Sequence, residues 1–239
     1  MNADTPNRPP LPVTPPDALG PTQREAVVID DRTFTILRPT DSDRLLDHPV
    51  VRDAFAADEY LPYWADLWPA ARMLAKAILR EPWDEYRARL GPLHALEIGC
   101  GLGLPGVAAL AAGLRVTFSD YDATALRFAA DNAAVNGFDG FATLQMDWRY
   151  PPDGLQFPVV LASDLIYELR NVDPVVALIK RVLHPDGLCL ATDQDRVPSQ
   201  MLREALAREG LPFTAQTARA GEPGGRRVKG TLYRITRRP

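Results

Sequence analysis

The feature that most restricts the fold is a regular alternation of strand and helix patterns from Leu93 to Glu209. Short apolar runs such as 94–99 and 158–163 are separated by longer segments whose apolar residues recur at helical spacing. Helical crossovers of this kind connect parallel strands and cover both faces of a sheet. Two strand patterns that flank a turn-rich stretch near the C-terminus predict an antiparallel hairpin at one edge. We therefore expect an α/β fold with a doubly wound, mostly parallel seven-stranded sheet.

The chain begins with a proline-rich stretch over residues 1–21 that shows almost no apolar periodicity. Such a segment buries too little apolar surface to offset the conformational entropy lost on ordering. We expect a disordered tail over 1–21 and a single domain over 22–239.

Before the main sheet, two further features are expected. Apolar, β-branched runs at 26–29 and 32–39 predict a small N-terminal β-hairpin. Apolar residues at helical spacing predict two helices, one over 44–57 and one over 64–80.

The composition argues against several classes of partner. Lys and Arg number 27 and Asp and Glu number 31, so the net charge is −4 and nucleic acid is a disfavoured partner. The longest apolar run, around 104–114, is too short to span a bilayer, and the N-terminus has no apolar signal region. We expect a cytoplasmic protein without a membrane segment. With two cysteines and three scattered histidines, no metal site is expected, and Cys100 and Cys189 should be small buried residues.

A glycine-rich loop lies between an apolar strand pattern and an apolar helix pattern and contains Glu97, Gly99, Gly101, Gly103 and Gly106. Glycines at such a junction let the backbone turn sharply and let a ligand approach it closely. The last three glycines also satisfy the dinucleotide fingerprint, so an NAD-dependent oxidoreductase remains an alternative. However, a Glu97 carboxylate would repel a pyrophosphate, whereas it suits the ammonium and sulfonium groups of S-adenosylmethionine. We therefore expect Glu97 and the first three glycines to bind S-adenosylmethionine.

Acidic residues that end the next two strand patterns are candidates for the adenosine part of the ligand. Asp120 follows the glycines by about 20 residues, where a carboxylate can accept both ribose hydroxyls. The alternative is a helix cap, the role we favour for Asp122. Asp147 is positioned for the adenine amino group, with Trp148 or Met146 near the ring, unless Asp147 is only a solvated loop residue.

The fourth strand pattern ends in Ser163 and Asp164, followed by Tyr167. This edge of a doubly wound sheet borders the ligand crevice, so we expect Ser163 at the cofactor and the other two beside the transferred group. A turn cap for Asp164 and a core position for Tyr167 remain alternatives. Trp68 could contact a sulfonium through a cation–π interaction, or could be a core aromatic, which is the role expected of Trp64.

Taken together, these motifs resemble one known family. The glycine loop, the acid after the second strand, SDLIY at 163–167, YWADLWPAARMLA at 63–75 and KGTLYRI at 229–235 are similar to the lysine-methyltransferase-like branch of class I, seven-strand methyltransferases. The similarity covers residues 25–236. It implies a Rossmann-like fold, S-adenosylmethionine as cofactor and a protein substrate that presents a lysine. A small-molecule methyltransferase is the alternative, and we expect a monomer.

The resemblance also implies roles for individual residues. Gly99, Gly101, Asp120 and Asp147 would hold the cofactor, Trp68 would line its methionine end, and Asp164 with Tyr167 would face the acceptor. A lysine must lose its proton before it can attack, and a nearby carboxylate would raise its pKa. We therefore expect Asp164 to recognise and orient the amine and Tyr167 to align its lone pair, and we assign neither residue as the general base.

Overall fold

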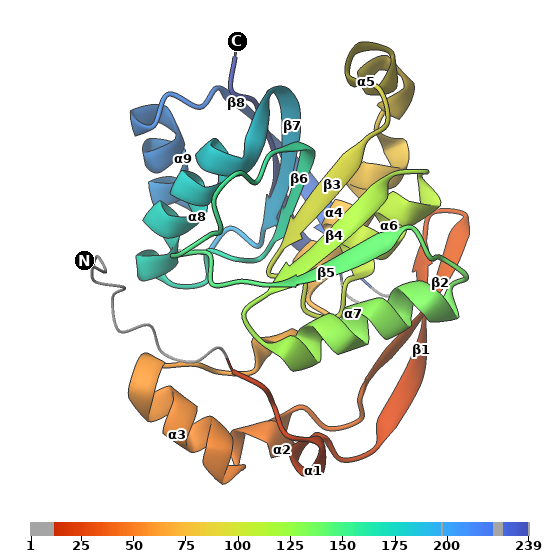
Figure 1. Cartoon of the computed structure of the whole chain (residues 1–239), viewed down its shortest axis with the longest axis vertical. Coiled ribbons are helices and arrows are strands. Elements are labelled where there is room, and N and C mark those ends of the chain that lie inside the picture. Colours follow the sequence, from red (N-terminus) through yellow and green to blue (C-terminus); the bar gives the residue numbers. More distant parts are fainter. Residues whose placement is uncertain (1–11, 197, 222–226, 239) are drawn as a thin grey trace, which may run out of the picture.

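A computed structural model describes residues 12–196, 198–221 and 227–238. Its centre is a seven-stranded sheet with the order β5-β4-β3-β6-β7-β9-β8 (Figure 1). The strands are β3 (His94–Ile98), β4 (Arg115–Asp120), β5 (Phe141–Gln145), β6 (Phe157–Ser163), β7 (Leu183–Asp193), β8 (Phe213–Ala220) and β9 (Val228–Ile235). Neighbours from β5 to β7 pair in parallel, whereas β9 is antiparallel to both β7 and β8. The predicted sheet and its C-terminal antiparallel hairpin are confirmed.

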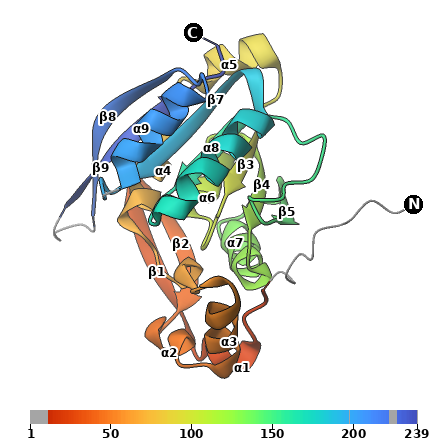
Figure 2. The same cartoon turned by 90° about the vertical axis from the view of Figure 1, so that its left-hand side faces the viewer.

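Helices cover both faces of this sheet (Figure 2). They are α4 (Pro69–Arg80), α5 (Trp83–Leu90), α6 (Leu104–Ala111), α7 (Ala123–Val135), α8 (Leu169–Val182) and α9 (Pro198–Arg208). Side chains of α4, α6 and α7 form one apolar cluster with the sheet, and those of α8 and α9 form the other. In β6, Val159 and Leu161 belong to the first cluster and Val160 and Ala162 to the second. This alternation buries the central strand on both faces, as parallel sheets require.

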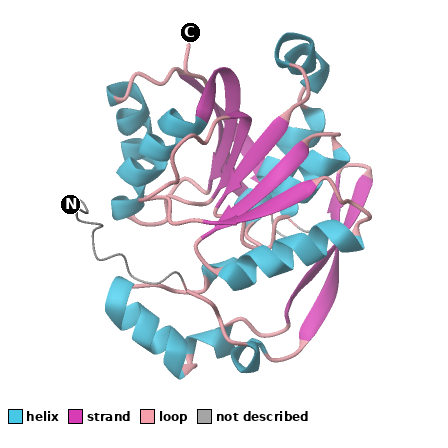
Figure 3. Cartoon of the chain, viewed as in Figure 1, coloured by secondary structure: helices cyan, strands magenta, loops and turns pink. Residues whose placement is uncertain are grey.

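The predicted N-terminal hairpin is present as β1 (Thr22–Ile29) and β2 (Arg32–Pro39), a separate two-stranded sheet (Figure 3). Its second strand is held by two asparagine side chains of α7. Asn132 Oδ1 accepts from the backbone N of Leu37 at 2.6 Å, and Asn136 Oδ1 accepts from that of Thr35 at 2.9 Å. The amide nitrogens of both asparagines donate back to the carbonyls of the same two residues. The side chains thus satisfy backbone groups that would otherwise lie at an unpaired strand edge.

The helices before the sheet differ in their bounds from the two that were predicted. The first segment is divided into α2 (Asp43–Leu46) and α3 (Pro49–Asp58), and the second into a short 3-10 turn, η1 (Tyr63–Ala65), and α4. Pro49 and Pro69 each occupy a first-turn position of the helix that follows. Proline has no N–H and disfavours helical geometry in the residue before it, so a helix begins at each of these positions. Helix α5 was not predicted from the sequence.

Part of the N-terminal extension packs against the domain, in contrast to the expected disordered tail. Residues Pro16–Leu19 form α1, and Thr14 is buried. The backbone N and Oγ1 of Thr14 both donate to the carboxylate of Asp122, at 3.2 and 2.5 Å. Hydrogen bonding to the rest of the fold therefore orders residues 12–19, although their sequence has no apolar periodicity. Residues 1–11 lie outside the described part of the chain.

Within the ranges given above, no helix is both long and apolar enough to cross a membrane. The same residues contain no group of three or more His, Cys, Asp or Glu side chains placed to hold a metal ion. Cys100 and Cys189 are both free and buried, as expected of small apolar residues.

Candidate active site

A cavity of about 590 Å³ lies where β3, β4, β5 and β6 end. The strand order reverses direction between β3 and β6, and ligands of doubly wound sheets bind at such a switch point. A volume in this range is typical of small-molecule sites. Of the predicted site residues, all except Glu97 line this cavity, namely Trp68, Gly99, Gly101, Gly103, Asp120, Asp147, Trp148, Ser163, Asp164 and Tyr167.

The turn from β3 to α6 forms the floor of the cavity and requires glycine. Gly99, Gly101 and Gly103 all have positive φ, at 57°, 51° and 77°. A Cβ on Gly99 would lie 2.6 Å from Leu165 Cδ2, and one on Gly101 would lie 3.3 Å from the backbone O of Trp64. Only glycine, which has no Cβ, adopts this turn easily while other segments of the same chain approach it so closely.

Glu97 is placed behind the glycine loop and not in the cavity. Its side chain is buried, and its Oε2 accepts a hydrogen bond of 2.9 Å from the backbone N of Gly106 in the first turn of α6. Burial raises the pKa of Glu97 well above its usual range. A Cβ on Gly106 would lie 2.5 Å from Glu97 Oε2, so this glycine makes room for the carboxyl group. Glu97 therefore does not line the cavity, because its carboxyl group points from the face of the sheet toward α6.

Asp120 ends β4 and lies directly beside the glycine loop. Its Oδ2 accepts from the backbone N of Gly101 at 2.9 Å, and its Oδ1 accepts from that of Asp122 at 3.1 Å. Burial raises the pKa of Asp120 to about 6, although these hydrogen bonds act in the opposite direction. Asp122 is the N-cap of α7, with Oδ1 accepting from Thr124 N at 2.7 Å. The structure thus separates the two neighbouring acids, one in the cavity and one at the helix cap, as expected.

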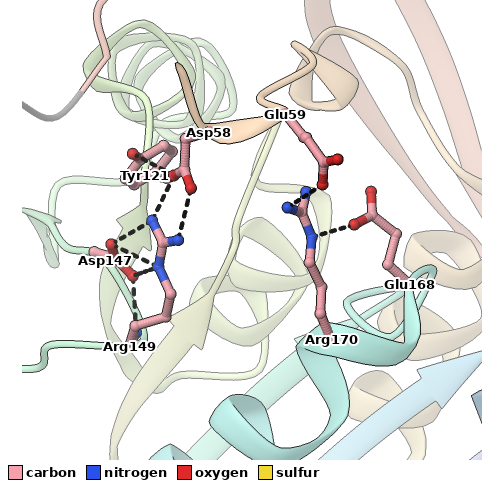
Figure 4. A network of polar contacts seen from close by, with 7 residues as sticks. All are labelled: Asp58, Glu59, Tyr121, Asp147, Arg149, Glu168 and Arg170. Atoms are coloured by element: carbon pink, nitrogen blue, oxygen red, sulfur yellow. Dashed lines mark hydrogen bonds and ion pairs between the residues drawn. The ribbon is translucent and has the colours of Figure 1, made fainter. Parts of the chain in front are cut away.

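Asp147 belongs to a network that crosses the cavity mouth, which we call the Arg149 clasp (Asp58, Tyr121, Asp147 and Arg149; Figure 4). Arg149 Nη1 and Nη2 donate to the two carboxylate oxygens of Asp58 at 2.9 and 2.6 Å, and Nε contacts both oxygens of Asp147. Tyr121 also donates to Asp58, at 3.1 Å. The hydrogen bond from Arg149 is the main cause of the lowered pKa of Asp58. The clasp joins the end of α3 to the loop after β5.

A second network of cavity-lining residues, which we call the Arg170 clasp, consists of Glu59, Glu168 and Arg170 (Figure 4). Arg170 forms ion pairs with Glu59, the residue that ends α3, and with Glu168 before α8. Glu59 has φ 52°, and its backbone N donates to Phe55 O at 2.7 Å, so the chain leaves α3 in a tight turn above the cavity. Sequence patterns gave no sign of either clasp, because the pairs that link α3 to the rest of the site, Asp58–Arg149 and Glu59–Arg170, come from segments far apart in the chain.

Three aromatic residues line one end of the cavity. The ring of Tyr63 lies 5.0 Å from that of Tyr167 and 6.1 Å from that of Trp68, and both pairs are edge-to-face. Trp68 Nε1 donates to the backbone O of Tyr63 at 2.8 Å, which fixes the indole. Burial raises the pKa of Tyr167 to about 12, so its hydroxyl stays protonated. Trp64 packs on Phe128 in the core, and the role of Tyr63 was not predicted.

Asp164 follows β6 at the same end of the cavity, with a left-handed φ of 61°. It is 7% exposed, and burial raises its pKa. Gln194 Nε2 donates to Asp164 Oδ2 at 2.6 Å, and Arg196 forms an ion pair with Oδ1. The structure thus brings Asp164, Tyr167 and Trp68 to one end of the cavity, and adds Gln194 and Arg196, which sequence reasoning missed.

A glycine turn after the first strand of a seven-stranded sheet, followed by acids at the ends of the next two strands, defines a class I, Rossmann-like methyltransferase. The particular family follows from comparison with known proteins. The chain belongs to the lysine methyltransferase family, whose model matches residues 63–204. This finding confirms the resemblance and favours S-adenosylmethionine over NAD as the ligand of the glycine loop.

Curated relatives are protein methyltransferases by name. The histidine protein methyltransferase 1 homolog of Dictyostelium discoideum is 32% identical over 44% of this chain and 36% of its own length. The protein-lysine N-methyltransferase rrg1 of Schizosaccharomyces pombe is 25% identical over 71% of this chain and 58% of its own length. The chain therefore spans about a third to somewhat over half of these relatives.

Solved structures support the fold. A ribosomal protein L11 methylase from Lactobacillus delbrueckii subsp. bulgaricus aligns with a TM-score of 0.55 at 22% identity, covering 71% of this chain and 79% of that chain. The N-methyltransferase NodS from Bradyrhizobium japonicum, crystallised with S-adenosyl-L-homocysteine, aligns with a TM-score of 0.55 at 16% identity, covering 77% of this chain and 96% of that chain. At these identities the likeness concerns the Rossmann-like fold.

Proposed function

We propose that this protein is an S-adenosylmethionine-dependent methyltransferase that methylates a lysine side chain of a protein. The observation that carries the proposal is the division of one cavity into two ends. The glycine loop, Asp120 and Asp147 follow β3, β4 and β5 on one side of the switch point, whereas Asp164 and Tyr167 follow β6 on the other, with Tyr63 in ring contact with both Tyr167 and Trp68. The first end has donors and acceptors for a nucleoside, and the second has an acid and aromatic rings for an amine.

The residues present fit S-adenosylmethionine. The positive φ values of Gly99, Gly101 and Gly103 turn the backbone along the cavity that these residues line, and Asp120 offers a carboxylate beside it. The carboxylate suits ribose hydroxyls, and Asp147 with Trp148 suits the adenine. Ser163 lines the cavity between these groups and Asp164. The bound cofactor supplies the methyl group on a sulfonium.

At the acceptor end, this chain's residues bind and orient the nucleophile. Methyl transfer to nitrogen is an in-line displacement, so correct positioning provides much of the acceleration. Asp164 accepts an N–H of the acceptor amine, and the Tyr167 hydroxyl helps to align its lone pair. Trp68 and Tyr63 line the same cavity, where the face of an aromatic ring attracts a cation such as the sulfonium of the cofactor. Removal of the proton from the amine needs no dedicated base, since solvent can accept it.

The protein acceptor is supported by the relatives, which are named for methylation of histidine, lysine and arginine in proteins. Lysine is favoured among these by the family description. The net charge of −4 disfavours nucleic acid as the acceptor. We propose further that the protein is a monomer. We also propose a cytoplasmic location, because its two buried cysteines are free thiols and the cytoplasm keeps thiols reduced.

Substitution of Asp164 by Asn tests this assignment. We expect Asp164→Asn to bind S-adenosyl-L-homocysteine within a few-fold of wild type but to lose most transfer of radiolabel from S-adenosylmethionine to proteins of a cell extract, because the amine loses its charged partner. Asp173→Asn, at an exposed site on α8, is the matched control. Label recovered as methyllysine supports the proposal. Label found only in RNA or in small metabolites would rule out the lysine acceptor while leaving the cofactor assignment intact.

A further inference from the structure

Asp164 already has two polar partners at the acceptor end of the cavity. Gln194 donates to Oδ2 at 2.6 Å, and the guanidinium of Arg196 forms an ion pair with Oδ1. The Arg196 side chain is 36% exposed and lines the cavity wall. The negative charge of the Asp164 carboxylate is therefore compensated by the guanidinium of Arg196, which lies in the loop after β7.

This compensation matters because of the chemistry of an amine acceptor. The nitrogen uses its lone pair to form the new N–C bond while the C–S bond breaks with its electron pair on sulfur. It must therefore enter the reaction without the proton that occupies the lone pair. An unperturbed lysine has a pKa of about 10.4, and a carboxylate beside it raises that value further. An uncompensated Asp164 would bind the acceptor as an unreactive ammonium.

We propose that Arg196 is a positioning residue that neutralises the charge of Asp164, so that the cavity binds the acceptor lysine as a neutral amine. The inference rests on the proposed function and deepens it. Asp164 can still accept an N–H of the amine, because each carboxylate oxygen offers two lone pairs. Methylation leaves the nitrogen positively charged, and it then releases one of its own protons to solvent.

The other charged groups around the cavity do not replace Arg196. The two remaining arginines among its described lining residues are engaged in the Arg149 and Arg170 clasps at the mouth. Asp66 accepts from the hydroxyl of Ser42 at 2.9 Å, and Asp120 accepts from backbone N–H groups. Asp193 lies behind the pair, 4.0 Å from Arg196 Nη2. The acceptor end is thus rich in acids, and Arg196 is the cation in contact with Asp164.

A pH–rate profile of Arg196→Gln tests the proposal. Loss of the cation raises the pKa of the bound amine, so we expect the acid limb of kcat at saturating acceptor to move to higher pH by about one unit, with a loss of about tenfold in rate near neutral pH. The rate is the transfer of label from S-adenosylmethionine to the most strongly methylated protein of a cell extract. Arg196→Lys should restore the wild-type profile. Arg208→Gln, which removes a cation from an exposed pair on α9, is the matched control.

A second measurement does not depend on activity. The carboxyl carbon of Asp164 can be titrated by NMR, and its pKa should rise in Arg196→Gln because Arg196 lowers that value in the wild type. An unchanged titration, or an unchanged pH–rate profile in the folded variant, would overturn the inference. Higher activity at every pH with a lower acceptor KM would also overturn it, since Arg196 would then obstruct the acceptor. If the wild type transfers no methyl to protein, the proposed function fails, while the titration still decides the role of Arg196.

Discussion

Asp120 lies beside the glycine loop, and its carboxyl group has a raised pKa. Two backbone N–H groups hold its carboxylate against the glycine loop, and burial still raises its pKa to about 6. Folding therefore raises this pKa, and the folded protein binds the proton more tightly than the unfolded chain does. The contribution of Asp120 to the free energy of unfolding is full at pH values below its unfolded pKa and is lost as pH rises through about 6. Cofactor affinity, in contrast, should increase as pH rises through this range.

Affinity for S-adenosyl-L-homocysteine should fall as pH is lowered from about 7.5 to about 5, because protonation of Asp120 removes the charged acceptor of the ribose hydroxyls. Asp120→Asn should bind at least about tenfold more weakly near pH 7.5, since a charged hydrogen bond contributes about 1.5 to 3 kcal/mol. It should also lose most of the pH dependence. Calorimetric titration measures both effects. Asp131→Asn, on the exposed face of α7, is the control, and equal affinity in the two variants would assign Asp120 a structural role.

At the scale of elements, helix α3 is joined to the domain beside the cavity mouth. The two clasps connect its C-terminal end to the loop after β5 and to the first turn of α8 (Figure 4). The Asp147 carboxylate in the Arg149 clasp is almost fully buried, at 3% side-chain exposure, and Arg149 compensates its charge. Loss of Arg149 would leave this charge without its main partner, which is costly in a buried site.

Arg149→Gln should increase the rate of hydrogen exchange in α3 and the dissociation rate of S-adenosyl-L-homocysteine, because the variant loses the link between Asp58 and Asp147. Hydrogen exchange followed by mass spectrometry and a stopped-flow displacement assay measure the two effects. Arg52→Gln removes an exposed ion pair with Asp47 near the same helix and should change neither. Exchange in α3 that matches wild type would show that the Arg149 clasp does not restrain the helix.

The N-terminal segment is the second element with an expected effect on stability. Removal of residues 1–20 should lower Tm, since Asp122 loses its hydrogen bonds from Thr14 and the buried Ala18 and Leu19 are deleted. Each lost hydrogen bond costs about 0.5 to 1.5 kcal/mol. Removal of residues 1–11 alone keeps every contact described above and should leave Tm unchanged. Calorimetric melting of both truncations provides the comparison, and an equal Tm for the two would mean that residues 12–20 contribute nothing.

At the scale of the whole molecule, we expect S-adenosyl-L-homocysteine, the product formed from the cofactor, to stabilise the folded protein against unfolding. A dinucleotide should not do so. S-adenosyl-L-homocysteine at 100 times its Kd should stabilise the protein by about 2.7 kcal/mol. For a chain of this size, Tm should then rise by about 5 to 10 °C. NAD at the same concentration should leave Tm unchanged, because the acids that line the cavity disfavour a pyrophosphate. A shift with NAD and none with S-adenosyl-L-homocysteine would contradict the cofactor assignment.

The sequence by itself determined the sheet, the hairpins and the residues that the strand ends and the glycine loop contribute to the cavity. Strand and helix periodicities are local properties of the sequence. Because the carboxyl ends of neighbouring parallel strands meet at one edge of the sheet, the sequence alone placed Asp120, Asp147 and Asp164 near the glycine loop. The positive φ of the loop glycines follows from the same turn. These features depend on neighbouring residues in the chain and on general rules of sheet topology.

Only the tertiary structure decided which groups these residues contact. Arg149 is 91 residues from Asp58, Arg170 is 111 residues from Glu59, and Asp122 is 108 residues from Thr14, so no local pattern indicates these pairs. The same holds for Glu97, which points toward α6, and for Arg196, which lies against Asp164. The direction of a buried side chain and the partner of a charge depend on how distant segments pack. Periodicity therefore located the active site, whereas packing set its electrostatics.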